Sequence, residues 1–80
     1  MWHIYIAKCA DGTLYTGITT DIERRMREHN SETVGAKYTR ARRPLTLVYT
    51  EDCETRSEAS KREACIKKLS RSEKERLFKK

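Results

Sequence analysis

The stretch from Trp2 to Thr19 reads "WHIYIAKCADGTLYTGIT" and decides the fold, because it holds two β-rich runs with a turn between them. Residues 2–9 and 14–19 are rich in β-branched and aromatic side chains, and an Asp-Gly pair stands at 11–12. Two such runs around an Asp-Gly pair are typical of a β-hairpin. The stretch therefore predicts two antiparallel strands that are neighbours in the sheet.

The length of the hairpin loop determines which side chains share a face. A two-residue loop would pair Tyr5 with Ile18 and divide the apolar residues between both faces. A three-residue loop over 11–13, with its glycine in the left-handed region, gathers the apolar residues on one face, and we therefore expect it. That face would carry Trp2, Ile4, Ile6, Leu14 and Ile18, and the opposite face Tyr5, Ala7 and Cys9 beside Tyr15, Gly17 and Thr19.

Three helix starts follow, each with a hydroxyl residue three positions before a glutamate, which is the spacing of a capping box. The pairs are Thr20 with Glu23, Thr55 with Glu58, and Ser70 with Glu73. They predict helices over residues 21–30, 56–69 and 71–79. The run "LTLVYT" over 45–50 alternates as a third strand does, so the element order is β-β-α-β-α-α. This order favours an α+β fold, a small antiparallel sheet covered by helices, in a single domain over residues 1–80.

Composition points to a polyanionic partner. The chain has 80 residues and carries 18 Lys and Arg against 12 Asp and Glu, a formal net charge of +6. Such a surface favours nucleic acid. The three cysteines form no Cys-x-x-Cys pair, which argues against a disulfide framework and a zinc site. We expect a cytoplasmic protein with no membrane span, because no apolar run is long enough and the start "MWHIYIAKC" turns polar too early for a signal peptide.

Two polar side chains border the apolar stripe of the first helix. Ile22 and Met26 define that stripe, while Arg25 and His29 stand four residues apart beside it and can reach the same point. One interpretation is that both are boundary residues with buried stems and exposed heads. The other is that both face a ligand.

Glu63 falls within the inward stripe of the second helix, marked by Ala59, Ile66 and Leu69. A carboxylate there is costly unless it is paired, hydrogen-bonded or bound to a metal. Its spacing fits a metal ligand and, equally, a salt bridge to a neighbour such as Arg25 or Lys67.

These residues and the two strand tyrosines, Tyr5 and Tyr15, form a set with useful chemistry. Tyrosines on strands are common packing residues, yet two phenols, a guanidinium, an imidazole and a carboxylate together suit phosphodiester hydrolysis. That reaction needs a proton acceptor for water and positive charge beside the phosphate. Mg²⁺ or Mn²⁺ can be held by one carboxylate together with waters and substrate oxygens.

The loop "GAKYTRARRP" before the third strand is the second basic feature. Its cations and one aromatic ring can contact a phosphate backbone and stack on a base. The expected contacts are Lys37, Tyr38, Arg40, Arg42 and Arg43. The basic run from Lys61 to Lys80 is interpreted as solvated surface.

At this point the residues resemble a known pattern. "HIY" at 3–5 followed by "YTG" at 15–17 resembles the paired motif that names the GIY-YIG nuclease superfamily. The likeness extends to the arginine-x-x-x-histidine spacing of Arg25 and His29, and to Glu63 within "SKREACIKKL". Over its whole length the chain is similar to the small stand-alone bacterial branch of that superfamily.

The resemblance implies a three-stranded antiparallel sheet flanked by helices, and metal-dependent cleavage of DNA. It implies that Tyr5 accepts a proton from water directly or through a relay, that Arg25 stabilises the phosphate and that Glu63 holds the metal. Tyr15 would position the nucleophile or the phosphate, and His29 would assist proton transfer or contact substrate. Gly17 would allow close approach of the backbone.

The sequence also departs from the pattern. His3 stands where the motif name has glycine, Thr16 where it has isoleucine, and Ile18 where some relatives carry a lysine near the phosphate. No DNA-binding domain of the kind that larger relatives use is expected within these residues.

Two hypotheses follow. The first is a Mg²⁺-dependent endonuclease acting on DNA, including branched, nicked or single-stranded forms, with DNA repair as a fitting setting. The rival is a non-catalytic nucleic-acid-binding module or partner subunit that keeps the nuclease fold. The sequence leaves open DNA against RNA, the need for a protein partner and the oligomeric state.

Overall fold

A computed structural model describes residues 1–31 and 41–79 of the chain. The elements within them are β1 (Trp2–Lys8), β2 (Leu14–Thr19), α1 (Ile22–His29), β3 (Thr46–Cys53), α3 (Arg56–Lys67) and α4 (Arg71–Phe78). This order confirms the predicted β-β-α-β-α-α arrangement of an α+β fold.

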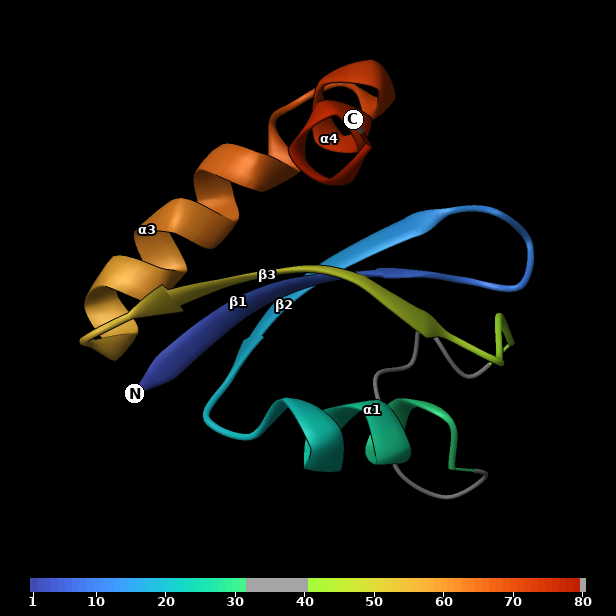
Figure 1. The fold of residues 1–80 in the computed structure, drawn as a ribbon, viewed down its shortest axis with the longest axis horizontal. Coiled ribbons are helices and arrows are strands. Elements are labelled where there is room, and N and C mark those ends of the chain that lie inside the picture. Colours follow the sequence, from blue (N-terminus) through green and yellow to red (C-terminus); the bar gives the residue numbers. More distant parts are fainter. Residues whose placement is uncertain (32–40, 80) are drawn as a thin grey trace.

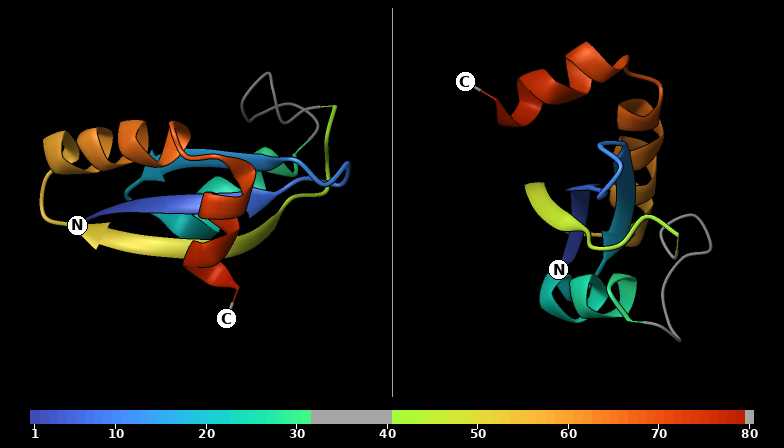
Figure 2. Two further views of the ribbon diagram at one scale, coloured as in Figure 1. Left: turned by 90° about the horizontal axis from the view of Figure 1, so that it is seen from above. Right: turned by 90° about the vertical axis from the view of Figure 1, so that its right-hand side faces the viewer.

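Three layers make up the molecule (Figure 1). The described strands form an antiparallel sheet in the order β2-β1-β3, with β1 in the centre. Helix α1 covers one face, and α3 and α4 cover the other. Figure 2 shows α3 lying over the β2 side of the sheet, while α4 turns across toward β3. Both faces are therefore covered by helices, and β2 and β3 are the two edges.

The apolar residues divide between the two faces as the strand alternation predicts. Ile4 and Ile6 form a fully buried cluster with Ala59 and Ile66 of α3, against which Trp2, Leu14 and Ile18 pack. On the other face, Tyr5, Ala7, Cys9 and Leu45 form a second cluster, against which Tyr15, Ile22 and Met26 pack. The alternation thus places the two tyrosines on the α1 side.

The hairpin loop lies one residue earlier than predicted. Tyr5 pairs with Gly17 and Lys8 with Leu14, and the Cys9 amide donates to the Thr13 carbonyl at 2.8 Å, so the loop is 10–12. Gly12 has φ 87°, and a left-handed residue belongs at the last position of such a loop. The predicted loop 11–13 would have put this glycine in the middle. Pairing partners shift by two residues, so the faces stay as predicted.

Helix starts agree with the capping pattern in two of three cases. Thr55 accepts from the Glu58 amide, and Ser70 and Glu73 make both bonds of a capping box. The N-cap of α1 is Asp21, whose carboxylate accepts from the Arg24 amide at 3.0 Å, so the predicted Thr20 cap is wrong. An aspartate is at least as good a cap as threonine, and its use moves the helix start by one residue.

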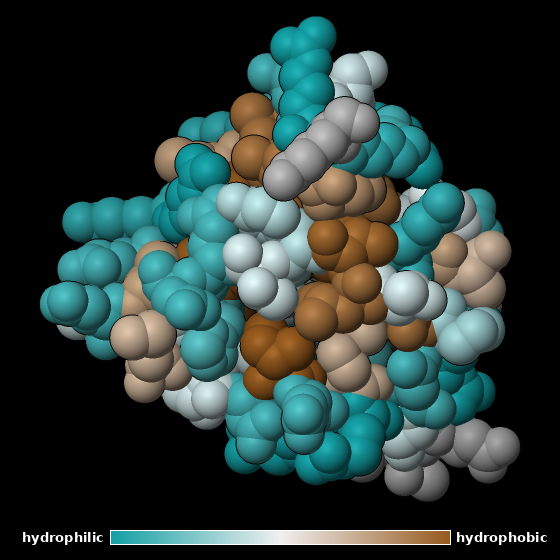
Figure 3. Space-filling model, viewed as in Figure 1, coloured by the Kyte–Doolittle hydropathy of each residue, from teal (hydrophilic) through white to brown (hydrophobic). Residues whose placement is uncertain are grey.

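Strand β3 is longer than the predicted 45–50, because it pairs along all of β1, up to Trp2 with Cys53. Figure 3 shows apolar side chains gathered over the middle of the face that carries β3, between α4 and α1. A shallow hollow of about 370 Å³ lies there, lined by Leu47, Val48, Tyr49, Thr50 and Phe78. In the part of the chain that the structure describes, no helix has the length and apolar character needed to cross a bilayer.

Candidate active site

A buried hydrogen bond joins the central strand to the end of α1. The Tyr5 phenol oxygen lies 2.6 Å from Nε2 of His29. Tyr5 is 1% exposed and His29 is 0% exposed. His29 is therefore a buried partner of Tyr5. The interpretation of His29 as a boundary residue with an exposed imidazole is wrong.

Gly17 leaves the room in which the Tyr5 ring lies. A Cβ atom built on Gly17 would stand 2.6 Å from the Tyr5 hydroxyl oxygen and 2.8 Å from the adjacent ring carbon. A Cβ atom does not approach other heavy atoms this closely, so a side chain here would displace the ring. What packs against Gly17 is the Tyr5 side chain, and the close approach of the Gly17 backbone to nucleic acid stays a prediction.

Tyr15 completes a cluster of three rings. Its ring centroid lies 5.0 Å from that of His29 and 6.2 Å from that of Tyr5. Edge-on and tilted arrangements at these separations are favourable for aromatic pairs. Tyr15 is half-buried, so it is the member of the cluster that is open to solvent.

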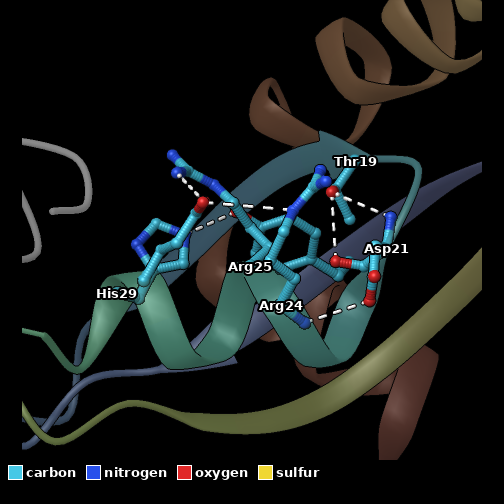
Figure 4. Close-up of polar contacts among 7 residues, drawn as sticks. Thr19, Asp21, Arg24, Arg25 and His29 are labelled. Carbon is cyan, nitrogen blue, oxygen red and sulfur yellow. Dashed lines mark hydrogen bonds and ion pairs between the residues drawn. The ribbon is translucent and has the colours of Figure 1, made fainter.

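Arg25 stands one turn before His29, and both side chains rise from the same side of α1 (Figure 4). Its guanidinium donates to the Glu28 carboxylate at 3.0 Å, and the side chain is 27% exposed. Burial by itself would lower the pKa of Arg25, but hydrogen bonding to Glu28 and Tyr5 outweighs it, so the pKa is raised. The cation is therefore permanent, oriented and accessible.

The Tyr5 and His29 pair is electrically neutral at neutral pH. Burial, which the Arg25 guanidinium opposes, raises the pKa of Tyr5 to about 12. Burial, together with the positive charge of Arg25, lowers the pKa of His29 to about 4. The phenol therefore keeps its proton while the imidazole carries no extra one. In the tautomer protonated at Nδ1, the Tyr5 hydroxyl donates to Nε2.

Glu63 lies on α3, on the other face of the sheet, and its charge acts on the cluster from there. Its side chain is 23% exposed, and its negative charge is one of the influences that raise the Tyr5 pKa. Lys67 Nζ lies 3.5 Å from the carboxylate, so the predicted salt-bridge alternative is present. Lys67 is mostly exposed, and such a pair contributes little stability. The pair therefore leaves the carboxylate open to a competing cation.

The donor set fits a weakly held hard cation. Among residues 1–31 and 41–79, no group of three or more His, Cys, Asp or Glu side chains comes together as a metal cage. Mg²⁺ needs only one or two carboxylates when waters and phosphate oxygens supply the remaining ligands. Glu63, a half-buried carboxylate whose charge acts on Tyr5, could supply one such ligand.

The basic loop is only partly described. Lys37, Tyr38 and Arg40 lie outside the described residues. Arg42 donates to the Asp11 carboxylate of the hairpin loop at 3.1 Å, and its carbonyl accepts from the Ala10 amide. Arg42 thus holds the end of this segment, just before β3, against the β1–β2 loop, and Arg43 beside it is half-buried.

Sequence reasoning missed Glu28. Its carboxylate contacts the Arg25 guanidinium and also lies 4.0 Å from Arg24, and it acts on His29 by tending to raise the pKa. The spacing of three residues from Arg25 would have indicated the contact, because such pairs are neighbours on a helix surface.

Comparison with known proteins supplies an independent result. The family described as "GIY-YIG catalytic domain" matches residues 1–76. A UPF0213 protein of Desulfotalea psychrophila is 64% identical over 78 residues, which are 98% of this chain and 71% of the relative. One of Halobacterium salinarum is 56% identical, with 98% of this chain and 100% of the relative covered.

Two solved structures share the fold. The solution structure of a UPF0213 protein from Bacillus halodurans is 47% identical, with a TM-score of 0.60 over 96% of this chain and 82% of that one. A solution structure from E. faecalis is 52% identical, with a TM-score of 0.64 over 96% and 81% of the two chains.

Proposed function

The chain belongs to the GIY-YIG family, a family of nucleases, and we propose that it is a metal-dependent endonuclease that hydrolyses phosphodiester bonds in DNA. The observation that carries the proposal is the convergence of a neutral Tyr5–His29 pair, the Arg25 cation and the Glu63 carboxylate around one edge of the sheet. The net charge of +6 adds attraction to a polyanion.

Arg25 is the group that would bind the scissile phosphate. A guanidinium presents paired N–H donors that match phosphate oxygens, and it stays charged as the transition state gains negative charge. Glu28 holds the guanidinium by a 3.0 Å bond, so the donors are oriented before substrate arrives. Tyr15, the half-exposed phenol beside it, would hydrogen-bond the attacking water or a phosphate oxygen.

Tyr5 and His29 would act as a proton relay. A phenolate at Tyr5 is disfavoured because the pKa is about 12, so Tyr5 is a poor base by itself. In the relay, the phenol oxygen accepts a proton from the attacking water while the phenol proton passes to Nε2 of His29 over the 2.6 Å bond. The positive charge then rests on the imidazolium, and the nearby Glu28 carboxylate favours it.

Glu63 would hold the metal ion, Mg²⁺ or Mn²⁺, which supplies positive charge to the phosphate and lowers the pKa of water. The same carboxylate favours the neutral phenol at Tyr5. It therefore helps to keep the relay proton in place until the reaction begins.

The deciding experiment is a cleavage assay of the wild-type chain beside Glu63→Gln. Labelled duplex, single-stranded, nicked and branched DNA, with RNA counterparts, are incubated with Mg²⁺, Mn²⁺ or EDTA. We expect metal-dependent scission by the wild type and a loss of about 100-fold or more in Glu63→Gln, because charge neutralisation at the phosphate is removed. DNA affinity in EDTA should stay close to that of the wild type.

Glu58→Gln is the matched control, because Glu58 is an exposed carboxylate on the same helix. It should cleave as the wild type does. Equal loss in both variants, or scission that persists in EDTA, would contradict the metal role of Glu63.

The burial of Tyr5 and His29 favours a second candidate, a nucleic-acid-binding module that keeps the nuclease fold. Groups that are 1% and 0% exposed cannot exchange protons with bulk water unless the site opens. This candidate predicts intact binding with no scission of any of these substrates, with or without metal.

A further inference from the structure

A basic hollow adjoins the candidate site along the outer edge of β2. It has a volume of about 310 Å³ and is lined by Leu14, Tyr15, Thr16, Lys67 and Lys74. We call it the β2-edge pocket. A smaller hollow of about 130 Å³ continues it toward the hairpin loop, lined by Thr13, Leu14, Arg71 and Lys74. Lys74 of α4 lines both, so it stands where the two hollows meet.

Lys74 is half-buried, and within the described ranges no carboxylate lies within ion-pair distance of its ammonium group. Arg71 of α4 and Lys79 at its C-cap differ from Lys74, because both pair with Glu75. Partial burial of an unpaired charge is unfavourable. An anion bound in the pocket would remove that cost.

Thr16 provides a second, independent observation. It is 4% exposed, lines the same pocket, and its hydroxyl has no hydrogen-bond partner in the described structure. Buried hydroxyl groups are nearly always hydrogen-bonded, since an unmet one costs free energy. The hydroxyl oxygen itself has almost no accessible surface, so a ligand oxygen would become its partner once the Thr16 side chain rotates toward the pocket that the residue lines.

The pocket is continuous with the candidate site at two places. Tyr15 lines it, and the ring of Tyr15 stands 5.0 Å from that of His29. Lys67 lines it too, and its ammonium group lies 3.5 Å from the Glu63 carboxylate. A nucleic acid strand with one phosphate at Arg25 and Glu63 would therefore bring the next part of its backbone to the β2 edge.

We propose that the β2-edge pocket binds a backbone phosphate of the nucleic acid strand beside the phosphate that is cleaved, with Lys74 as its cation and the Thr16 hydroxyl as a hydrogen-bonding partner. The inference rests on the proposed function, since it needs nucleic acid at the site. It adds a role for α4, whose basic residues the sequence alone suggests are solvated surface.

The test measures binding of a short labelled single-stranded DNA by fluorescence anisotropy, in EDTA and over a series of salt concentrations. Lys74→Gln should weaken binding about 3- to 10-fold and reduce the slope of log K against log salt by about 0.7, because one phosphate contact is lost. Lys74→Arg should restore most of both.

Arg76→Gln is the matched control. It removes one positive charge from the same helix, but residue 76 is exposed and lies about 200° around the helix from residue 74. Its effect on affinity should be less than about twofold. Equal effects of the two substitutions would overturn the proposal, because general attraction to the net charge would then explain both.

Thr16→Val separates binding from folding. Replacing an unsatisfied buried hydroxyl by a methyl group should raise the melting temperature, while binding weakens about threefold. A variant that is more stable and binds as the wild type does would overturn the role of the hydroxyl.

Arg25→Gln separates this inference from the proposed function. If Arg25→Gln weakens binding and Lys74→Gln does not, the phosphate site at the β2 edge is wrong while nucleic-acid binding at the main site stands. If the wild type binds no DNA or RNA, both are wrong.

Discussion

At the scale of single residues, the missing side chain of Gly17 controls where the Tyr5 hydroxyl lies. The ring occupies space that a Cβ atom would enter at 2.6 Å, and Tyr5 is 1% exposed, so its neighbours would have to shift with it if it moved. The hydrogen bond to His29 therefore depends on a glycine in the neighbouring strand.

Gly17→Ala should consequently displace the Tyr5 ring. We expect a loss of about 1–3 kcal/mol in the free energy of unfolding, as for other overpacked interiors. Any cleavage activity should fall about 100-fold, because the phenol would leave its position. Denaturant unfolding and the cleavage assay measure the two effects.

The double variant Gly17→Ala with Tyr5→Leu is the control for this steric argument. It should recover much of the stability, since the clash is gone, and none of the activity. If Gly17→Ala is as stable as the wild type and keeps its activity, the packing of Tyr5 over Gly17 is not needed.

His29 makes stability depend on pH in a defined window. Its pKa is about 4 in the fold and near 6.5 when exposed, so between these values the unfolded chain binds more protons than the folded one. The contribution of His29 is fully present above about pH 6.5 and is lost as pH falls toward 4. The free energy of unfolding should therefore decrease on acidification through this window.

His29→Gln should make the free energy of unfolding less dependent on pH between about pH 4 and 6.5, as measured by urea unfolding at a series of pH values. His3→Gln is the control, because His3 is the other histidine of the chain and contacts Asp52 at a partly exposed site. Parallel curves for the wild type and His29→Gln would show that the buried imidazole is not the titrating group.

At the scale of elements, alternation and capping pairs were enough to predict every described helix and strand in order. Ile4 and Ile6 are buried under α3, and Tyr5 and Ala7 under α1, because successive side chains of a strand point to opposite faces. Both apolar sets therefore follow from the period of two residues. The Ser70–Glu73 pair likewise fixes the start of α4 by local hydrogen bonds.

The exact ends of helices and strands could not be predicted from local sequence patterns. The start of α1 moved because Asp21 competes with Thr20 for the same amides, and both are good caps. Strand β3 extends to Cys53 because β1 offers partners that far, which is a tertiary property. The complete burial of His29 also depends on packing between α1 and the sheet, so spacing on the helix could place it only at the border of the stripe.

At the scale of the whole molecule, the candidate site joins groups from both layers of helices. Arg25 and His29 come from α1 and Glu63 from α3, two helices on opposite faces of the sheet (Figure 2). Because Tyr15 of the edge strand β2 belongs to the same ring cluster, we place the site at the β2 edge. The sequence could indicate which residue types form the site. That side chains from α1 and α3 act at one place could be seen only in the folded structure. A nucleic acid strand at this edge would also lie near α4, because Lys74 lines the same pocket as Tyr15.

The segment around Arg40, Arg42 and Arg43 carries the last prediction, which concerns the charge of the whole surface. Replacing all three by glutamine should weaken DNA binding and reduce the slope of log K against log salt by up to about 2, because each phosphate contact on a single strand contributes about 0.7. Anisotropy titrations at several salt concentrations measure both. Arg42 already pairs with Asp11 at 3.1 Å, so this ion pair has to give way before the Arg42 guanidinium can contact a phosphate.

Asp11→Asn is the informative control, because it removes the competing carboxylate and should increase the contribution of Arg42 to binding. A second control replaces by glutamine three exposed cations, which are Lys61 on α3, Lys68 at its C-cap and Arg76 on α4. That triple variant loses the same net charge, so the two triple variants differ only in where the charge is removed. If the segment binds phosphate, the arginine triple variant should bind DNA more weakly than the control triple variant does. Its slope of log K against log salt should also be smaller. Equal affinities and equal slopes would mean that DNA responds to the net charge of the molecule and not to this segment.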